Sequence, residues 1–395
     1  MLKFNNDIYN CSGCTACYSI CPVHCISMKK DQFGFLYPVS SDACIDCGAC
    51  EKVCPWVKPI QKTSTKPKVY AELTHKHTTW QKSTSGGAFS DICKSWGDEE
   101  TIIYGASWKG FEVHHISVCG LSNIAPLRKS KYLSSYLDDT FSNVSEDLKR
   151  GKRVIFSGSP CQVDGLKHFL RKDYENLLTI DIICHGQESP TLFKDYISWL
   201  SEQLQEDILS YEFRAKGYAQ SMGYTSLVTT KKKRYYLSLD PYNQLFLARR
   251  GMRPSCAFNC RYQSTHRCSD ITIADCKGLS DIFPHLKNSH YNYSTIICNT
   301  EKGLHVVESL KRNNTLLEYS VDDVIKFNPL FASKEPCNKE DFIKFNADYL
   351  EKGKEVFLSW AKPLRYTRPL RKNTVYRFIP SQLWPLFDTL IKYIR

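Results

Sequence analysis

Residues 11–22 read CSGCTACYSICP, and residues 44–55 repeat the pattern as CIDCGACEKVCP. Each copy has the form Cys-x2-Cys-x2-Cys-x3-Cys-Pro. This is the spacing with which a chain holds two 4Fe-4S clusters, and the fourth cysteine of each run binds the cluster of the other run. The repeat therefore predicts two clusters close to the start of the chain.

The crossed pattern assigns each cysteine to one cluster, as in two-cluster bacterial ferredoxins. The first cluster is expected on Cys11, Cys14, Cys17 and Cys54, and the second on Cys21, Cys44, Cys47 and Cys50. A zinc knuckle is the alternative, although zinc sites use pairs of cysteines rather than triplets. Cys25 lies outside the pattern and is expected to be a small buried thiol. For residues 1–62 we therefore expect an α+β ferredoxin-like dicluster domain.

Composition narrows the class of protein further. The chain has 395 residues, of which 42% are hydrophobic, and 19 cysteines. No run of 18 apolar residues is present, and the start has no apolar stretch. We therefore expect a cytoplasmic protein. In such a protein we expect the thiols to bind metal. The excess of 53 Lys and Arg over 41 Asp and Glu gives a charge of +12. Because each cluster with four thiolates contributes about −2, we expect no nucleic-acid partner.

After a polar linker at 61–68, the sequence alternates between strand and helix patterns. Strands are expected at 69–73, 101–107, 114–119, 153–158, 177–184, 208–213, 224–230, 271–275 and 294–298. Helices are expected at 87–96, 138–150, 162–171, 189–206, 242–250 and 303–312. This alternation predicts an α/β domain with a mixed sheet over residues 69–340.

Residues 341–395 are expected to form a basic, aromatic C-terminal extension. Its end shows apolar residues at three-four spacing, which predicts a helix with one apolar face. Two interpretations of this tail stand side by side. It contacts an anionic membrane surface at the inner face of the membrane, or it docks against its own domain or a second subunit.

Four cysteines of the larger domain stand at special places in the predicted elements, namely Cys161, Cys184, Cys256 and Cys260. Cys161 opens a helix, Cys184 ends a strand, and the other two flank a short loop. One interpretation is a third four-thiolate site. The alternative is a mixture of buried thiols and one reactive cysteine, since a helix N-terminus stabilises a thiolate. Core packing is expected for Cys93, Cys119 and Cys298, and the roles of Cys268, Cys276 and Cys337 are left open.

The sequence Ser85-Gly86-Gly87 precedes the helix expected from about Ala88. Glycines let a backbone approach a phosphate, and a helix N-terminus favours an anion. The stretch is interpreted either as a cradle for the pyrophosphate of a flavin nucleotide or as a plain turn.

A series of motifs then gives a resemblance to a known family. The motifs are SGG at 85–87, KY at 131–132, GSPCQ at 158–162, CHG at 184–186, SP at 189–190, FRAK at 213–216, RPSC at 253–256, DITIAD at 270–275 and NTEKG at 299–303. In this order they resemble the coenzyme F-420 hydrogenase/dehydrogenase beta-subunit family, in the form with an N-terminal two-cluster ferredoxin. The resemblance covers about residues 10–312.

The resemblance implies FAD in the larger domain and a third 4Fe-4S cluster beside it. Cys161, Cys184, Cys256 and Cys260 would be the ligands of that cluster, and Ser85, Gly86, Gly87 and Lys131 would lie near the flavin. The expected function is an iron–sulfur flavoprotein oxidoreductase that couples one-electron and two-electron chemistry. Its redox partner would be a ferredoxin or a hydride donor. Relatives in polysaccharide assembly suggest a small molecule or sugar as substrate, and no catalytic residue is assigned.

The alternative function comes from another class. The chain would then be an electron-transfer subunit without an organic substrate, passing electrons to a partner enzyme. The sequence does not decide between FAD, FMN and no flavin.

Overall fold

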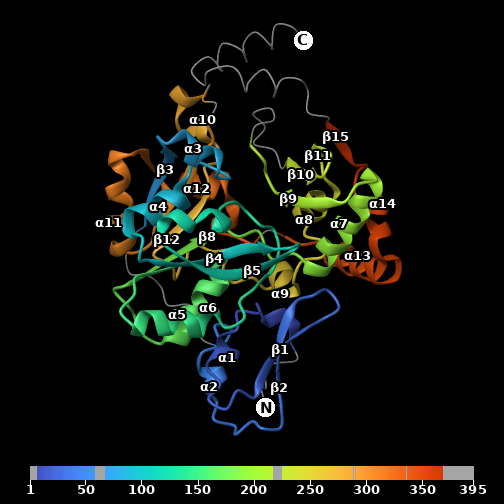
Figure 1. Cartoon of the computed structure of the whole chain (residues 1–395), viewed down its shortest axis with the longest axis horizontal. Coiled ribbons are helices and arrows are strands. Elements are labelled where there is room, and N and C mark those ends of the chain that lie inside the picture. The colour runs from blue at the N-terminus through green and yellow to red at the C-terminus, as the bar shows by residue number, and fades with distance from the viewer. Residues whose placement is uncertain are drawn as a thin grey trace.

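The computed structural model describes residues 7–57, 67–216, 225–287, 289, 291–334 and 336–367 (Figure 1). The cysteine-rich segment forms a small unit at one end of the molecule. Its strands β1 (Ile26–Lys30) and β2 (Leu36–Ser40) pair antiparallel, and its helices are α1 (Ala16–Ser19) and α2 (Ala49–Lys52). Each short helix contains the third cysteine of its run, so the two halves of the sequence repeat form equivalent local structures.

The larger domain is built on a nine-stranded mixed sheet with the order β14-β3-β13-β12-β8-β7-β4-β5-β6. Its strands are β3 (Lys68–Thr74), β4 (Ile102–Lys109), β5 (Glu112–Cys119), β6 (Ser135–Tyr136), β7 (Val154–Ser157), β8 (Leu177–Ile182), β12 (Ile271–Asp275), β13 (Ser294–Cys298) and β14 (Asn314–Tyr319). The central strands β4, β7, β8 and β12 run parallel, and the remaining pairs are antiparallel except β5 with β6. Strands such as β7, which is Val-Ile-Phe-Ser, are apolar on both faces because the sheet is covered on both sides.

Helices cover the two faces of this sheet and build separate cores. One core joins α4 (Ala88–Trp96) and α11 (Glu301–Glu308) to the sheet through buried side chains such as Ile92 and Val307. The other core joins α5 (Thr140–Lys149) and α6 (Pro160–Leu170) to the sheet, with Phe141 and Leu166 at its centre. Cys14, Ala16 and Val53 of the ferredoxin-like unit belong to this second core, so the two units share one hydrophobic interior.

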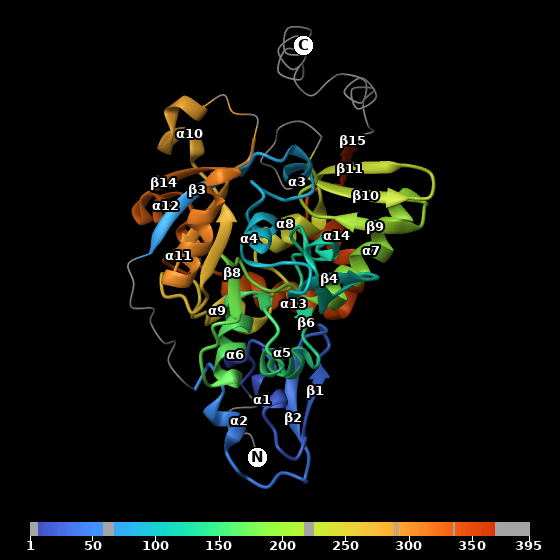
Figure 2. The same cartoon turned by 60° about the vertical axis from the view of Figure 1, so that its left-hand side comes forward.

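A second, four-stranded antiparallel sheet lies beside the large one (Figure 2), with the order β15-β11-β10-β9. Its strands are β9 (Ile208–Glu212), β10 (Ser226–Thr230), β11 (Arg234–Leu239) and β15 (Arg365–Thr367). The helices α7 (Pro190–Leu204), α8 (Pro241–Leu247), α13 (Lys339–Lys352) and α14 (Val356–Ser359) belong to the same region. Its core is rich in aromatic side chains, among them Phe193, Tyr196, Tyr242 and Phe345.

The expected fold class is confirmed: a ferredoxin-like unit precedes an α/β domain with a mixed sheet. The strands and helices expected in the larger domain are present with ends shifted by a few residues. The expectation did not include β11, β14, α12 (Val321–Phe327) or α13. The expected start of the extension at 341 falls inside α13, whose Phe345 packs in the same core as α7. Most of the linker at 61–68 lies outside the described residues, and so does the whole of the C-terminal tail at 374–395.

Among the described residues, no helix combines the length and the hydrophobicity that crossing a bilayer requires.

Candidate functional site

The first thiol set, which comprises Cys11, Cys14, Cys17 and Cys54, comes together as the crossed pattern predicts. All four cysteines line one small cavity in the ferredoxin-like unit. Burial raises the pKa of Cys14 well above its ordinary value, and the neighbouring thiols Cys17, Cys54 and Cys11 raise it further. Cys14 and Cys54 are buried and Cys11 and Cys17 are half-buried. Four neighbouring cysteines whose thiolates would repel one another need a cationic partner to ionise together.

The second thiol set, which comprises Cys21, Cys44, Cys47 and Cys50, lies farther from the larger domain. Cys21, Cys44 and Cys50 belong to one apolar cluster, and Cys47 is exposed. Burial, together with Glu51 and Cys44, raises the pKa of Cys50. The second set is therefore the more accessible of the two.

Cys25 is buried, as expected, and it packs in the same apolar cluster as Cys21, Cys44 and Cys50 of the second set. Its Sγ atom is 3.4 Å from the Sγ atom of Cys21. The hydrogen bond between these thiols, with a smaller contribution from burial and from Cys44, raises the pKa of Cys25 to about 11.

The third thiol set, which comprises Cys161, Cys184, Cys256 and Cys260, is assembled from distant parts of the chain. Cys161 lies in the first turn of α6, where Ser159 and Gln162 form a capping box. Cys184 follows β8, and Cys256 lies in α9 (Pro254–Phe258) with Cys260 just beyond it. Burial raises the pKa of Cys184 well above its ordinary value, and Cys256, Cys161 and Cys260 each raise it further. The four thiols are therefore electrostatic neighbours.

The spacing of the thiols bears on the zinc alternative. Across the described ranges, no three His, Cys, Asp or Glu side chains converge closely enough to hold a single metal ion. A zinc ion needs four ligands at about 2.3 Å from one centre. The thiolates of a 4Fe-4S cluster bind four different irons and stand farther apart.

The first and third sets meet at the contact between the two units. Burial raises the pKa of Cys161 to about 11, against the hydrogen bond with Ser159 Oγ at 3.2 Å and the nearby charge of Arg253. Ser255 Oγ, next to Cys256, donates a hydrogen bond of 2.8 Å to the carbonyl oxygen of Cys11. On α6, a Cβ atom added at Gly165 would lie 2.8 Å from Cys14 Sγ. A glycine at this position therefore allows the cysteine loop to approach the helix closely.

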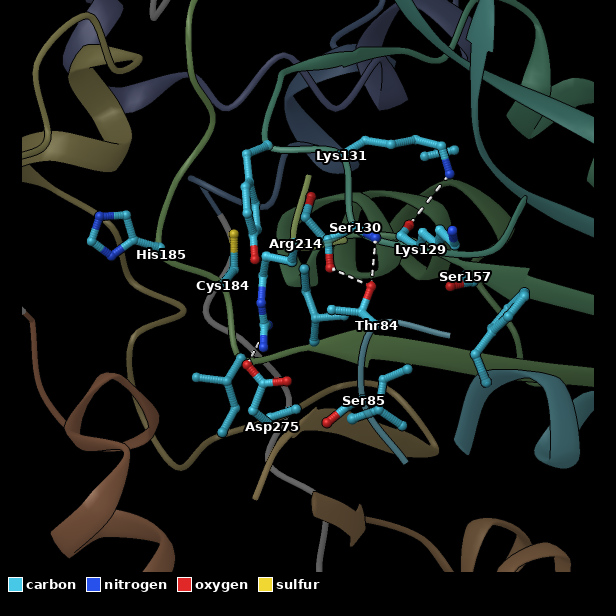
Figure 3. Close-up of a pocket in the computed structure, with 18 of the residues that line it drawn as sticks. Thr84, Ser85, Lys129, Ser130, Lys131, Ser157, Cys184, His185, Arg214 and Asp275 are labelled. Carbon is cyan, nitrogen blue, oxygen red and sulfur yellow. Dashed lines mark hydrogen bonds and ion pairs between the residues drawn. The ribbon is translucent and has the colours of Figure 1, made fainter. Parts of the chain in front are cut away.

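The third set borders a cavity of about 720 Å³ in the larger domain (Figure 3). Cys184 and His185 lie at one side of it, and the turn with Thr84 and Ser85 lies at another. Its described lining contains six Lys and Arg residues, namely Arg128, Lys129, Lys131, Arg214, Lys277 and Lys334, but a single acid, Asp275. The cavity is therefore large enough for a cofactor and favours an anionic ligand.

Three of the four residues expected near a flavin line this cavity: Ser85, Gly87 and Lys131. Gly86 lies behind the turn, where its N–H donates to Ser294 Oγ at 2.8 Å. A Cβ atom there would clash with the backbone of Glu72 and Ser294, so this position requires glycine. The expected helix after the turn is present as α4, which begins at Ala88.

Lys131 is a half-buried lysine whose Nζ atom donates to the carbonyl oxygens of Arg128 at 2.8 Å and Lys129 at 3.4 Å. Burial, followed by the charge of Lys129, lowers the pKa of Lys131 to about 7. Both acceptors are uncharged carbonyls. An anion in the cavity would supply the missing negative partner.

The structure adds residues to the site that the sequence did not assign. Arg214 and Asp275 form an ion pair of 2.5 Å on the cavity wall (Figure 3). Lys216 donates to the backbone oxygens of Trp80 and Ser85 and so supports the turn from behind. The signal for these residues is the pair of motifs FRAK and DITIAD, which carry the resemblance but give no role.

The remaining cysteines give one correction. Cys93 and Cys298 are buried, as expected, but Cys119 is exposed. Cys119 is the last residue of β5, which pairs with the edge strand β6 and has an alternating burial pattern only in its first half. Cys268 and Cys276 are buried thiols, and Cys337 is half-buried.

Comparison with known proteins supports both units. Residues 10–57 match the family model of the 4Fe-4S dicluster domain. Residues 151–324 match the family model for the C-terminal region of the beta subunit of coenzyme F420 hydrogenase/dehydrogenase, and this range contains the whole third thiol set. The residues expected near a flavin lie before this range.

The similar curated proteins are ferredoxins. A 7Fe ferredoxin of Hydrogenibacillus schlegelii is 52% identical over 40 residues, which are 10% of this chain and 46% of that protein. The chain thus spans less than half the length of this relative. A ferredoxin of Methanocaldococcus jannaschii is 33% identical over 69 residues, which are 16% of this chain and 90% of that protein.

A solved structure is similar over more of the chain. It belongs to the F420-reducing [NiFe] hydrogenase complex of Methanosarcina barkeri, with 12% identity, a TM-score of 0.43, and coverage of 76% of this chain and 93% of that chain. Two domains are therefore recognised in the chain: residues 10–57 form a 4Fe-4S dicluster domain of the ferredoxin type, and residues 151–324 form a domain of the type found at the C terminus of the beta subunit of coenzyme F420 hydrogenase/dehydrogenase.

Proposed function

We propose that this protein is an iron–sulfur flavoprotein oxidoreductase with three 4Fe-4S clusters and one FAD. The observation that carries the proposal is the order of the sites. The second thiol set, with its exposed Cys47, is followed by the first set and then by the third, whose Cys184 borders the cationic cavity. Clusters transfer single electrons and a flavin exchanges electron pairs, so the two together couple one-electron and two-electron chemistry.

The donor sets fit the clusters that we propose for them. The two repeats would hold two clusters on Cys11, Cys14, Cys17 and Cys54, and on Cys21, Cys44, Cys47 and Cys50. The third cluster would be held by Cys161, Cys184, Cys256 and Cys260. At Cys14 in the first set and Cys184 in the third, burial and the neighbouring thiols both raise the pKa, and a bound cationic cluster core would offset both effects.

The cavity fits an anionic cofactor. Lys131 and the turn at Ser85 and Gly87 would face the pyrophosphate, since a half-buried ammonium and a helix N-terminus both favour a dianion. We propose FAD rather than FMN because the cavity of about 720 Å³ exceeds what a mononucleotide fills. We also propose that the substrate is a small anionic molecule such as a nucleotide-linked sugar, because the other lining cations outnumber the single acid.

The domain limits that we propose follow the packing. The dicluster domain ends near residue 62, and the flavin-binding domain begins near 69. This domain extends to at least residue 364 rather than 340, because α13 and α14 pack in the same core as α7. A ferredoxin or a hydride donor is the proposed redox partner.

The test is anaerobic purification followed by measurement of iron, acid-labile sulfide and released flavin for each polypeptide. About twelve irons and one FAD are expected. About eight irons without flavin would reject both the third cluster and the flavin. The larger domain would then be a docking module, and its cysteines would be thiols.

An electron-transfer subunit without its own substrate is the second candidate, and the surface around the second thiol set favours it. Ile45 is 62% exposed between Cys44 and the exposed Cys47, and Val23, two residues after Cys21, is 40% exposed. Exposed apolar side chains next to a redox centre suit a protein partner. Hydride acceptance by the isolated chain from a nicotinamide or deazaflavin donor would reject this candidate.

A further inference from the structure

The side chain of Arg253 is buried between the first and third thiol sets. It stands just before α9, and its exposure is 1%. Its Nη1 atom donates to the carbonyl oxygens of Leu36 at 3.3 Å and Cys11 at 3.5 Å. Its guanidinium carbon lies 4.7 Å from the ring centroid of Phe35 and 4.8 Å from that of Tyr37. The larger domain thus inserts a fixed positive charge into the ferredoxin-like unit.

This charge lacks an ordinary counter-ion. No carboxylate among the described residues lies within ion-pair distance of the Arg253 guanidinium, and its Nε atom is buried without a hydrogen-bond partner. Burial raises the pKa of the half-buried Asp31, and the charge of Arg253 opposes that rise. The carboxylate of Asp31 accepts its hydrogen bonds from the backbone N–H groups of Phe33 and Phe35. A buried cation requires a negative partner, because the low local dielectric penalises an isolated charge.

Cysteines of two different sets lie next to Arg253: the carbonyl oxygen of Cys11 accepts from its Nη1 atom, and the N–H of Cys256 donates to its carbonyl oxygen at 2.9 Å. Its charge lowers the pKa of Cys11 in the first set and of Cys161 and Cys256 in the third set, each against a larger rise from burial. The contact is close: a Cβ atom at Gly13, in the loop between Cys11 and Cys14, would lie 2.7 Å from Arg253 Nη2.

We propose that Arg253 is the shared counter-charge of the first and third clusters and raises the reduction potentials of both, while leaving the second cluster unaffected. The inference rests on the proposed function. Reduction adds negative charge to a cluster, and a fixed cation at short range in a buried site stabilises the reduced form. Because one guanidinium serves two sites, its removal should shift both potentials in the same direction.

The test is a redox titration of the anaerobic holoprotein, followed by electron paramagnetic resonance. Arg253→Gln and Arg253→Met remove the charge; the first keeps a donor and the second keeps a chain that packs on Phe35 and Tyr37. Both are expected to lower the midpoint potential of two clusters. Arg253→Lys is expected to restore most of the shift. Arg150→Gln, at the exposed residue that follows the last turn of α5, is the matched control and is expected to change none of the potentials.

The outcomes separate this inference from the function on which it rests. About eight irons in the wild type would reject the third cluster and with it a shared role for Arg253. Twelve irons with unshifted potentials, or an equal shift of all three clusters, would reject the role of Arg253 alone. Loss of iron from the neutral variants but not from Arg253→Lys would support the counter-charge. Loss from all three variants would make Arg253 a structural residue and overturn the proposal.

Discussion

The first and third thiol sets differ in how the chain assembles them. Three of the four cysteines of the first set lie within seven consecutive residues, around one loop and the short helix α1. The third set takes one cysteine from α6, one from the end of β8 and two from the region of α9. The first site is therefore set largely by local geometry. The third exists only when the parallel strands β7 and β8 bring their carboxyl ends side by side.

This difference has a consequence for stability. Local spacing keeps three thiols of the first set near one another even in a partly unfolded chain, since the loops between them are short. The third set loses its geometry as soon as the sheet opens. We therefore expect the third site to depend on the fold of the larger domain, and the first to depend mainly on its own cysteines.

The largest effect is expected from Cys14→Ala. Cys14 is buried at the contact with α6 and is one of the four ligands proposed for the first cluster. Its loss should therefore remove about four irons per chain and much of the visible absorption. Iron analysis and absorption spectra measure this. Cys25→Ala, which removes a buried thiol outside the proposed ligands, should leave the iron content unchanged. Full iron content in Cys14→Ala would contradict the assignment.

The next effect tests the assembled site. Cys161→Ser should remove about four irons from the larger domain while the two ferredoxin-type clusters remain. Cys268→Ser is the control, because Cys268 is a buried thiol of the same domain outside the set. If Cys161→Ser keeps all its iron and only its reactivity falls, Cys161 is a catalytic thiol. The third set would then hold no cluster, and it could not be compared with the first set as a cluster site.

A third prediction concerns the contact between the sites. Gly165→Val places a side chain against Cys14, and overpacking there should lower the free energy of unfolding by about 1–3 kcal/mol. Thermal unfolding of the anaerobic protein measures this loss. Lys167→Val, a half-buried position on the same helix, should cost a few tenths of a kcal/mol through helix propensity. Equal melting temperatures for the two variants would show that the contact adds nothing.

The smallest effect concerns the cavity. The pKa of Lys131 is about 7 in the free protein, below the ordinary value of 10.5, so the anion-binding ammonium loses its proton as pH rises above 7. Affinity for ADP, used as a pyrophosphate probe for flavin-free protein, should therefore fall by up to about tenfold per pH unit above 7. Calorimetric titration measures this slope. Lys131→Met should abolish it, and Lys277→Met should keep it; a slope retained in Lys131→Met would exclude Lys131 as the anion-binding group.

Periodicity in the sequence predicts many elements of the larger domain, but not all of them. Strand β14 escapes prediction because residues 314–319 show no alternation of buried and exposed side chains. Helix α13 carries Phe342, Phe345 and Tyr349 at three-four spacing, which is a helix signal. Charged residues surround these apolar ones and suggest an extension, and only packing against α7 includes the helix in the domain.

The site shows the same limit. The turn at Ser85 and the helix after it follow from glycine chemistry, but the walls of the cavity come from segments spread between residues 83 and 336. Arg214 and Asp275 are 61 positions apart in the chain and meet only in the folded structure. The motifs FRAK and DITIAD contain these two residues but predict no role for them, because a motif gives the residue types and not their contacts.

The two cysteine repeats, the pairing of their ligands and the strand–helix alternation that follows can all be predicted from the sequence alone. These properties depend on spacing and periodicity, which a linear chain already contains. Only the folded structure shows that Cys184 joins Cys161, Cys256 and Cys260, that Lys131 is half-buried beside a cavity, and that Arg253 reaches both cysteine sets. Burial and proximity between distant residues are properties of the packed chain, because side chains far apart in sequence acquire neighbours only when the sheet and its helices close around them.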